Sequence, residues 1–311
     1  MDYQNKIEGI GKIFASAVTL GKFDGLHLGH QRLIQRILEQ KKRGLKAVVF
    51  AFDQGSRTIL TREERIQKLE KMGVDLFLEC PLDQKMRHMK PEEFVKKILV
   101  DQLHVSYLAV GRDFHFGYER KGNPQLLSKM GEQYGFTVEI VPDEMDGRRK
   151  ISSTYVREQL NEGNMEKVAQ LLGGYFSTTG EVLHGRGLGH RKLMPTTNLI
   201  PPKEKLMPPN GVYITYSRFG DQSFHGITNV GYKPTVGGEE FLGVETYLFQ
   251  CSQNLYGQKS VVSFLKFLRP ERKFESLEKL KNQLMQDIQK AQKFFDEHSG
   301  SWAVNTFEEN I

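Results

Sequence analysis

The sequence predicts an α/β domain with a doubly wound parallel sheet, followed by an antiparallel β-barrel with a C-terminal helix. A length of 311 residues suggests about two domains, at roughly 100–200 residues per domain. From residue 13 to about 141, short apolar runs alternate with amphipathic stretches, which is typical of βαβ units. After Gly173-Gly174 the chain carries short β-branched or aromatic runs between Gly, Pro and Asn clusters. We therefore expect domains at residues 1–173 and 174–311.

The first domain is expected to alternate strands with helices. Its strands are short runs rich in Val, Leu, Ile and Phe: Ala15–Leu20, Ala47–Phe52, Val74–Leu78, Tyr107–Val110 and Thr137–Val141. Its helices carry apolar residues at i, i+3 and i+4: Gly29–Arg43, Thr61–Met72, Pro91–Leu103 and Pro124–Tyr134. A proline in the first turn favours a helix start in the last two. The helical segment Thr154–Leu172 then closes the domain.

The second domain is expected to be mainly β. Its predicted strands are Val182–Leu183, Val212–Tyr216, Phe224–Val230, Val244–Phe249 and Val261–Phe267. The chain then forms an amphipathic helix, Leu277–Phe295, with one apolar stripe. Short strands at this spacing indicate an antiparallel barrel.

The charge balance is basic without a basic tail. The chain has 44 Lys and Arg against 38 Asp and Glu, a net charge of +6. Such a balance suits polyanionic ligands, including nucleotides, and does not require nucleic acid. The basic runs at residues 41–43 and 148–150 are interpreted as a solvated helix end and loop. A regulator that binds RNA would show aromatic residues interleaved with Lys and Arg, and this pattern is missing from the sequence.

Cysteine use and hydropathy indicate a cytoplasmic protein without a membrane partner. Cys80 and Cys251 lie far apart, outside any CxxC, so we expect two reduced thiols. No stretch approaches about 18 consecutive apolar residues, and the N-terminal residues do not resemble a signal peptide.

A glycine-rich segment directly follows the first predicted strand and opens the first helix. It reads GKFDGLHLGH from Gly21 to His30. Ligands of open α/β sheets bind beyond the carboxyl ends of strands, and the free N–H groups of a helix start attract phosphate. Gly21, Gly25 and Gly29 allow a tight turn and a close approach to a ligand. We therefore predict a phosphate site here.

The spacing His27-x-x-His30 places two imidazoles on one side of the first helical turn. Two N–H donors could then reach one triphosphate, which suits nucleotidyl transfer. The alternatives are two surface histidines that cap a helix start, or a metal pair. The segment is not a Walker P-loop, because Phe23 follows Gly-Lys where Ser or Thr would stand.

The segment ISSTYVR, residues 151–157, predicts a second phosphate clamp. Ser152, Ser153 and Thr154 are natural helix caps whose hydroxyls can serve phosphate oxygens instead. Arg157, in the same helix, can fork onto a phosphate. The alternative is an ordinary capped helix with a surface arginine.

The motif GxFDGxHxGH resembles that of the bacterial bifunctional riboflavin kinase/FAD synthetases, within the HxGH nucleotidyltransferases. Further stretches agree with that family in order and spacing, among them PEEFV at 91–95, GRDFHFG at 111–117 and ISSTYVR. The resemblance implies a Rossmann-like domain in which the phosphate of FMN attacks the α-phosphorus of Mg-ATP. Implied roles are charge stabilisation by His27, His30 and Arg157 and nucleotide binding by Gly21, Phe23, Asp24, Gly25, Ser152, Ser153 and Thr154. Asp113 would line the flavin side, while Phe114 and Phe116 could equally be core.

The carboxyl half resembles riboflavin kinase over nearly its whole length. Matching pieces include Gly185 to Gly189, PTTN at 195–198, NVG at 229–231, Val244-Glu245 and RPERKF at 269–274. The resemblance implies that Thr196 and Asn198 bind Mg²⁺ and ATP phosphates. It also implies that Glu245 is the general base and that Gly185 and Gly189 belong to a loop over the nucleotide.

The expected function is therefore the phosphorylation of riboflavin to FMN and the adenylylation of FMN to FAD, with ATP as co-substrate. Two segments depart from the family pattern: GHRKLMPTTN at 189–198 stands for GRxLGFPTxN, and VETYLFQC at 244–251 for VExHxxDF. The alternative is thus an FMN adenylyltransferase whose barrel is a degenerate flavin-binding or docking module.

Overall fold

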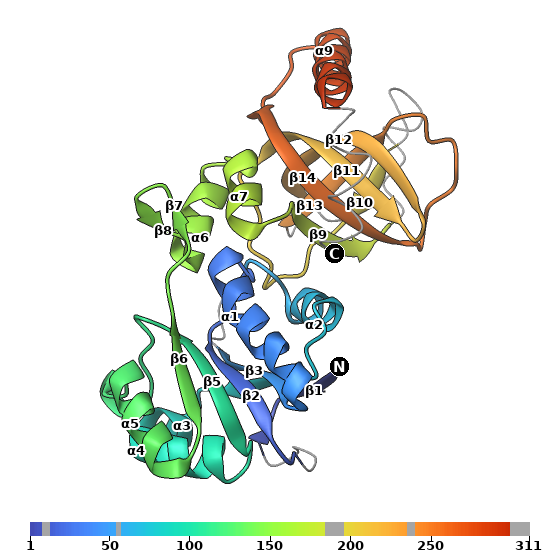
Figure 1. The fold of residues 1–311 in the computed structure, drawn as a ribbon. Coiled ribbons are helices and arrows are strands. Elements are labelled where there is room, and N and C mark those ends of the chain that lie inside the picture. Colours follow the sequence, from blue (N-terminus) through green and yellow to red (C-terminus); the bar gives the residue numbers. More distant parts are fainter. Residues whose placement is uncertain (8–12, 54–56, 184–195, 235–239, 299–311) are drawn as a thin grey trace. The chain divides into compact units, whose positions relative to one another are not determined.

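The computed structural model describes residues 1–7, 13–53, 57–183, 196–234 and 240–298. Their contacts divide the chain into two units, Met1–Ser56 with Arg62–Ser153, and Arg57–Thr61 with Thr154–Ile311. Both are drawn in Figure 1. The helix α7 (Met165–Leu172) packs against strands of the second unit, which is why the division falls early in the chain. The predicted domain boundary after residue 173 stays a prediction.

The first unit contains a six-stranded parallel sheet in the order β1-β4-β3-β2-β5-β6. Its strands are β1 (Asp2–Gln4), β2 (Ser16–Gly21), β3 (Lys46–Asp53), β4 (Leu76–Pro81), β5 (Val105–Gly111) and β6 (Thr137–Val141). From β2 onward this is the order of a doubly wound sheet, whose direction of winding reverses between β2 and β5. The predicted α/β class is therefore confirmed, and β1 is an additional edge strand.

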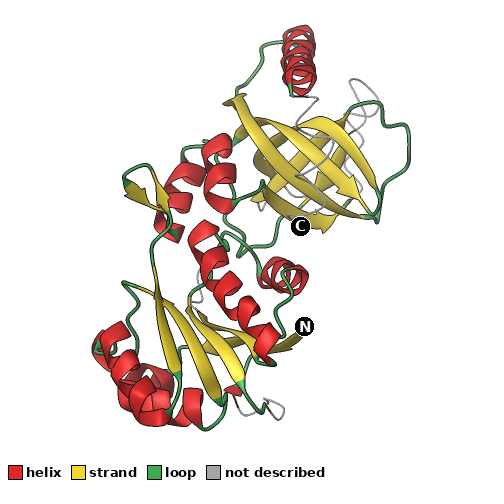
Figure 2. Ribbon diagram, in the orientation of Figure 1, coloured by secondary structure: helices red, strands yellow, loops and turns green. Residues whose placement is uncertain are grey.

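Helices cover both faces of this sheet. Figures 1 and 2 show α1 and α2 on one side and α3, α4 and α5 on the other. Their bounds are α1 (Leu28–Glu39), α2 (Arg62–Lys71), α3 (Gln84–His88), α4 (Pro91–Phe94) and α5 (Pro124–Tyr134). The predicted helix 91–103 continues past α4 as a π-helical stretch, η3 (Val95–Val100), and α1 ends in a 3-10 turn, η2 (Gln40–Arg43). Because both faces are covered, the central strands carry continuous apolar runs, as in VVFAF of β3.

The predicted helical segment 154–172 is two helices. α6 (Ser153–Asn161) ends before Gly163, whose φ is +74°, and α7 begins after Asn164. The Asn164 side chain accepts a hydrogen bond from the backbone N–H of Lys167 at 3.3 Å, so it caps α7. A left-handed glycine followed by an N-cap residue thus interrupts a pattern whose apolar spacing is continuous.

The second unit contains a six-stranded antiparallel sheet in the order β10-β13-β12-β11-β14-β9. Its strands are β9 (Phe176–Glu181), β10 (Thr197–Leu199), β11 (Gly211–Phe219), β12 (Gln222–Pro234), β13 (Glu240–Leu248) and β14 (Lys259–Pro270). Just past β9, Leu183 forms a bridge with Asn198 of β10, so the two edges of the sheet meet. This confirms the predicted barrel.

The predictions missed β9 and β10 because these strands are polar. β9 reads FSTTGE, and its Thr178 is fully buried despite its hydroxyl. The predicted strand 182–183 is only the bridge that follows β9.

The C-terminal helix α9 (Leu277–Glu297) packs on the barrel, close to its predicted extent. Ala291 and Phe295 lie in one apolar cluster with Val212, Ile214, Ile227 and Leu265. Arg269 of β14 donates to the buried carboxylate of Asp287 at 2.9 Å, which ties the helix to the sheet.

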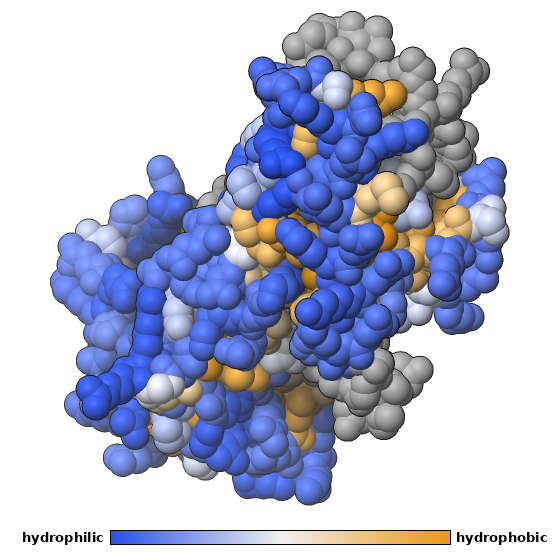
Figure 3. Space-filling view, turned by 90° about the horizontal axis from the view of Figure 1, so that it is seen from above, coloured by the Kyte–Doolittle hydropathy of each residue, from blue (hydrophilic) through white to orange (hydrophobic). Residues whose placement is uncertain are grey.

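The face of the molecule shown in Figure 3 is mainly polar. On the face shown in Figure 3, hydrophobic residues appear in small groups among hydrophilic ones. No helix within the described part of the chain is long and apolar enough to cross a membrane.

Candidate functional site

The loop between β2 and α1 has an unusual backbone. Phe23 and Leu26 have φ angles of 50° and 47°, and Gly25 between them has φ +82°. Left-handed conformations are costly for large residues and persist where packing enforces them. Phe23 and Leu26 are both fully buried, so burial holds the loop in this shape. The loop lies at the carboxyl end of β2, beside the switch point of the sheet.

His27 and His30 lie together at the start of α1. Their rings stack with centroids 3.7 Å apart and an interplanar angle of 21°. His27 is the N-cap residue, and its Nδ1 accepts the backbone N–H of His30 at 3.4 Å. The neutral ring of His27 therefore carries its proton on Nε2, where it can donate. His30 Nδ1 is buried and has no hydrogen-bond partner among the described residues.

Gly29 makes this stacked arrangement possible. A Cβ atom at Gly29 would lie 3.2 Å from both Cε1 and Nδ1 of the His27 ring. This contact is too tight for most side chains, so the glycine of HxGH provides the room for the His27 imidazole.

Burial keeps both imidazoles neutral near pH 7. Burial first, and then the positive charge of Lys150, lower the pKa of His27 from 6.5 to about 4. Burial, followed by the charges of His27 and Lys150, lowers the pKa of His30 well below its usual value. Two neutral rings can stack without the repulsion that two imidazolium ions would suffer.

These shifts predict a loss of stability in mild acid. Because His27 has a lower pKa in the folded state, the unfolded chain binds the extra proton between pH 6.5 and about 4, and stability falls across that window. His27 alone should account for on the order of 3 kcal/mol at the acid end. Urea unfolding of the first unit, followed by circular dichroism from about pH 7 to about pH 4.5, measures it.

The matched control for this prediction is His27→Asn, which keeps an N-cap acceptor and removes the titrating ring. The variant should depend less steeply on pH. An equal dependence in both proteins would contradict the prediction.

Lys150, in β8 (Arg149–Lys150), belongs to this site, although the sequence was interpreted as a solvated basic loop there. Its Nζ lies 2.7 Å from a carboxylate oxygen of Asp113 and 2.7 Å from one of Asp143. Burial of Lys150 acts in the opposite direction, but these hydrogen bonds raise its pKa. Burial likewise opposes the shift at Asp113, whose pKa is lowered by Lys150. The available sequence signal was its position directly before ISSTYVR.

The predicted second clamp is joined to the glycine-rich loop by a hydrogen bond. Ser153, the first residue of α6, donates its hydroxyl to the carbonyl oxygen of Asp24 at 2.9 Å. Ser152 precedes it and is partly buried. Thr154 and Arg157 belong to the second unit, in which Arg157 donates to the carbonyl oxygen of Arg57 at 2.6 Å.

The aromatic residues after Asp113 pack into the core. Phe116 is 4% exposed, and its ring stacks on Phe114 with centroids 5.6 Å apart. Phe116 also contacts Phe94 of α4 with centroids 5.5 Å apart. Phe116 is therefore core, whereas Phe114 is only partly buried against it.

In the second unit, three predicted residues and one unpredicted residue come together. The Thr196 hydroxyl donates to Glu245 Oε1 at 2.8 Å, and Asn198 lies opposite Glu245 in the β10–β13 register. Lys233, which the sequence analysis missed, donates to Asn198 Oδ1 at 2.9 Å and to Glu245 Oε2 at 2.7 Å. Gly185 and Gly189 lie outside the described residues.

A pocket of about 370 Å³ adjoins this cluster. It is lined by Thr196 and Thr197 together with Val182, Leu248 and the segment Cys251–Tyr256. Its walls are mainly apolar with a few polar groups, which suits a small-molecule ligand. Within the described ranges, no three His, Cys, Asp or Glu residues are placed to hold a metal ion.

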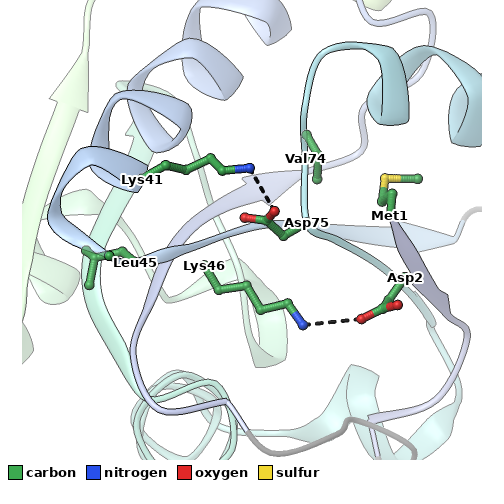
Figure 4. A pocket seen from close by; sticks show the side chains of 8 residues that line it. Met1, Asp2, Lys41, Leu45, Lys46, Val74 and Asp75 are labelled. Atoms are coloured by element: carbon green, nitrogen blue, oxygen red, sulfur yellow. Dashed lines mark hydrogen bonds and ion pairs between the residues drawn. The ribbon is translucent and has the colours of Figure 1, made fainter.

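A second pocket, of about 490 Å³, lies at the amino end of the parallel sheet and is shown in Figure 4. Two ion pairs lie within it, Lys41 with Asp75 at 2.7 Å and Lys46 with Asp2 at 3.2 Å. The N-terminal ammonium group of Met1, which also lines the pocket, pairs with Glu70 at 3.0 Å, so each of these charges already has a partner.

Both halves of the chain match known families. Residues 13–155 match the FAD synthetase family, and residues 172–295 match the riboflavin kinase family. Two relatives named bifunctional riboflavin kinase/FMN adenylyltransferase illustrate the similarity. The protein from Escherichia coli K12 is 35% identical over 89% of this chain and 92% of its own. That from Pseudomonas fluorescens is 37% identical over 87% of this chain and 90% of its own.

A solved structure shows the same two-part fold. It is described as a macrolide-efflux protein from Streptococcus pneumoniae, is 27% identical, and covers 94% of this chain and 98% of its own with a TM-score of 0.83. With relatives above 30% identity along nearly the whole length, the chain belongs to the family of bifunctional riboflavin kinase/FMN adenylyltransferases.

Proposed function

We propose that this chain phosphorylates riboflavin to FMN with its barrel and adenylylates FMN to FAD with its α/β half. The observation that carries the proposal is that, for each reaction, a group of the predicted polar residues lies together within one unit. His27 and His30 stack at the switch point of the parallel sheet, and Thr196, Asn198 and Glu245 converge on β10 and β13. ATP and flavins are the substrates of both reactions.

In the adenylyl transfer, a phosphate oxygen of FMN forms a bond to the α-phosphorus of ATP while the bond to pyrophosphate breaks. No covalent enzyme intermediate is needed, so the residues act by positioning and charge stabilisation. His27 presents Nε2–H to phosphate at the N-terminus of α1, where the helix also favours anions. Because phosphate charge favours protonated imidazole, nucleotide binding should raise the pKa of both histidines. Ser152, Ser153, Thr154 and Arg157 are proposed to bind phosphate oxygens.

In the kinase reaction, Glu245 is proposed to take the proton from the 5′-hydroxyl of riboflavin. The freed oxygen attacks the γ-phosphorus of ATP, and ADP leaves. Thr196 keeps the Glu245 carboxylate in place through the 2.8 Å hydrogen bond to Oε1. Gly185 and Gly189 are proposed to belong to the loop over the nucleotide.

The oxygen atoms of Thr196, Asn198 and Glu245 fit Mg²⁺. Hydroxyl, amide and carboxylate oxygens are the ligands that this hard cation prefers. Two of these oxygens, Asn198 Oδ1 and Glu245 Oε2, already bind a cation in the structure, the ammonium group of Lys233. Thr196 and Asn198 are the residues proposed to hold the ion. When bound, Mg²⁺ would neutralise charge on the transferred phosphoryl group.

Incubation of the purified protein with riboflavin and Mg-ATP, and separately with FMN and Mg-ATP, tests the proposal by chromatography of the flavins. FMN and FAD are expected from the first mixture, and FAD with pyrophosphate from the second. If only the second mixture reacts, the protein is an FMN adenylyltransferase with an inactive barrel. No product from either would overturn the assignment.

Replacement of Lys150 tests its proposed part in FAD formation. Lys150→Met removes a positive charge beside the histidines, so the pKa of His27 should rise, as measured by NMR titration of the ring. FAD formation should fall roughly fivefold, since a partly exposed cation contributes about 1 kcal/mol to the transition state. Lys121→Met, which removes an exposed ion pair with Glu119, is the control and should change neither quantity. An unaltered His27 pKa in Lys150→Met would contradict the assignment.

A further inference from the structure

Lys233 connects the groups on which the proposed kinase chemistry depends. Its Nζ donates to Asn198 Oδ1 at 2.9 Å and to Glu245 Oε2 at 2.7 Å, from three neighbouring strands in the order β10-β13-β12. Thr196 takes the other carboxylate oxygen, Oε1. Each carboxylate oxygen of Glu245 therefore accepts a hydrogen bond, Oε1 from Thr196 and Oε2 from Lys233. Of these two donors, Lys233 also donates to Asn198.

Gly243 of the neighbouring strand, β13, leaves room for the Lys233 side chain. A Cβ atom at Gly243 of β13 would lie 3.1 Å from Lys233 Cδ and 3.2 Å from its Cε. Any side chain at Gly243 would therefore press on the lysine stem. The Lys233 side chain is 28% exposed and that of Glu245 is 33% exposed, so water and small ions can reach the pair.

The ammonium occupies oxygens that a divalent cation would use. Asn198 Oδ1 cannot bind Lys233 and Mg²⁺ at full strength together, because the two cations would lie a few ångströms apart and repel. Entry of the metal with its nucleotide must then break at least the bond between Lys233 and Asn198.

We propose that Lys233 is a positioning residue and an internal competitor of magnesium in the kinase site. It holds Asn198 and Glu245 at a fixed separation before the nucleotide arrives, and it gives up Asn198 when the metal binds. This inference rests on the proposed kinase function of the barrel.

Two effects of Lys233→Met follow and go in opposite directions. The metal no longer displaces a bound ammonium, so Mn²⁺ should bind on the order of fivefold more tightly in the presence of ADP. Glu245 loses a fixed partner, so kcat for FMN formation should fall on the order of tenfold, with a smaller change in KM for riboflavin. A residue with only a structural role would weaken both metal binding and turnover.

The experiment titrates the full-length protein with Mn²⁺ at saturating ADP and measures free Mn²⁺ by electron paramagnetic resonance, a readout independent of turnover. Lys233→Arg keeps a cation and should bind Mn²⁺ like the unsubstituted protein. Lys259→Met, at an exposed lysine of β14, is the matched control, and circular dichroism checks the fold of each variant. Equal or weaker Mn²⁺ binding by folded Lys233→Met would overturn the proposal. Absence of FMN formation by the unsubstituted protein would instead count against the kinase function, and the Mn²⁺ comparison would still decide the role of Lys233.

Discussion

Replacement of Glu245 by Gln is expected to abolish FMN formation from riboflavin and to leave FAD formation from FMN unchanged. A carboxamide cannot take the proton of the 5′-hydroxyl, and general base catalysis contributes about 10²–10⁴-fold. The substitution also removes the ion pair with Lys233 at 2.7 Å while it keeps the shape of the side chain. Chromatography of flavins formed under saturating Mg-ATP measures both reactions in one preparation.

Glu240→Gln is the control, because Glu240 is an exposed carboxylate of the same strand, β13. It should retain both reactions. If Glu245→Gln forms FMN as fast as the unsubstituted protein, Glu245 is not the base, even though the barrel would remain a kinase.

Replacement of His30 by Ala is expected to slow FAD formation from FMN and to leave FMN formation from riboflavin unchanged. FAD formation should fall about a hundredfold or more, since one donor to a developing oxyanion is worth roughly 3 kcal/mol. FMN formation should persist, because His30 lies in the first unit and the kinase residues lie in the second. The rate of pyrophosphate release from FMN and Mg-ATP is the measurement.

His88→Ala is the matched control, since His88 is an exposed histidine of α3. His30→Gln, which keeps an N–H donor, should recover part of the lost rate. Unchanged FAD formation in folded His30→Ala would show that the ring of His30 only supports the loop that follows β2.

The predicted elements agree with the structure where local pattern and tertiary environment coincide. Apolar runs such as Ala47–Phe52 became central strands because both faces of a parallel sheet are covered by helices. The strands β9 and β10 were missed because they are short and mostly polar: FSTTGE buries only Phe176 and Thr178, and TNL buries only Leu199. The break at Gly163 was missed because the apolar spacing continues across it.

The sequence predicted the positions of some residues in the candidate sites but not their electrostatics or their contacts across the fold. The position of His27 and His30 at a helix start follows from their neighbours in sequence, and their stacking confirms that the spacing places them together. The low pKa of His27 could not be read from the motif, because it depends on burial of the ring in the folded protein and on the positive charge of Lys150. That Thr196 and Asn198 act together with Glu245 was expected from the resemblance alone. Their approach in the structure follows from the register of the barrel strands, which places Asn198 opposite Glu245.

The sequence by itself determined the order of the two halves and the glycine-rich loop with its paired histidines, because these depend on short-range periodicity and on residues that are neighbours along the chain. The proposed base, Glu245, was expected from the resemblance to riboflavin kinases. Only the tertiary structure placed Lys150 and Lys233 beside predicted residues of the two candidate sites. Lys150 of β8 pairs with Asp113, and Lys233 meets Asn198 and Glu245 across neighbouring strands. Sheet order and register set such ion pairs, and no spacing within the sequence records them.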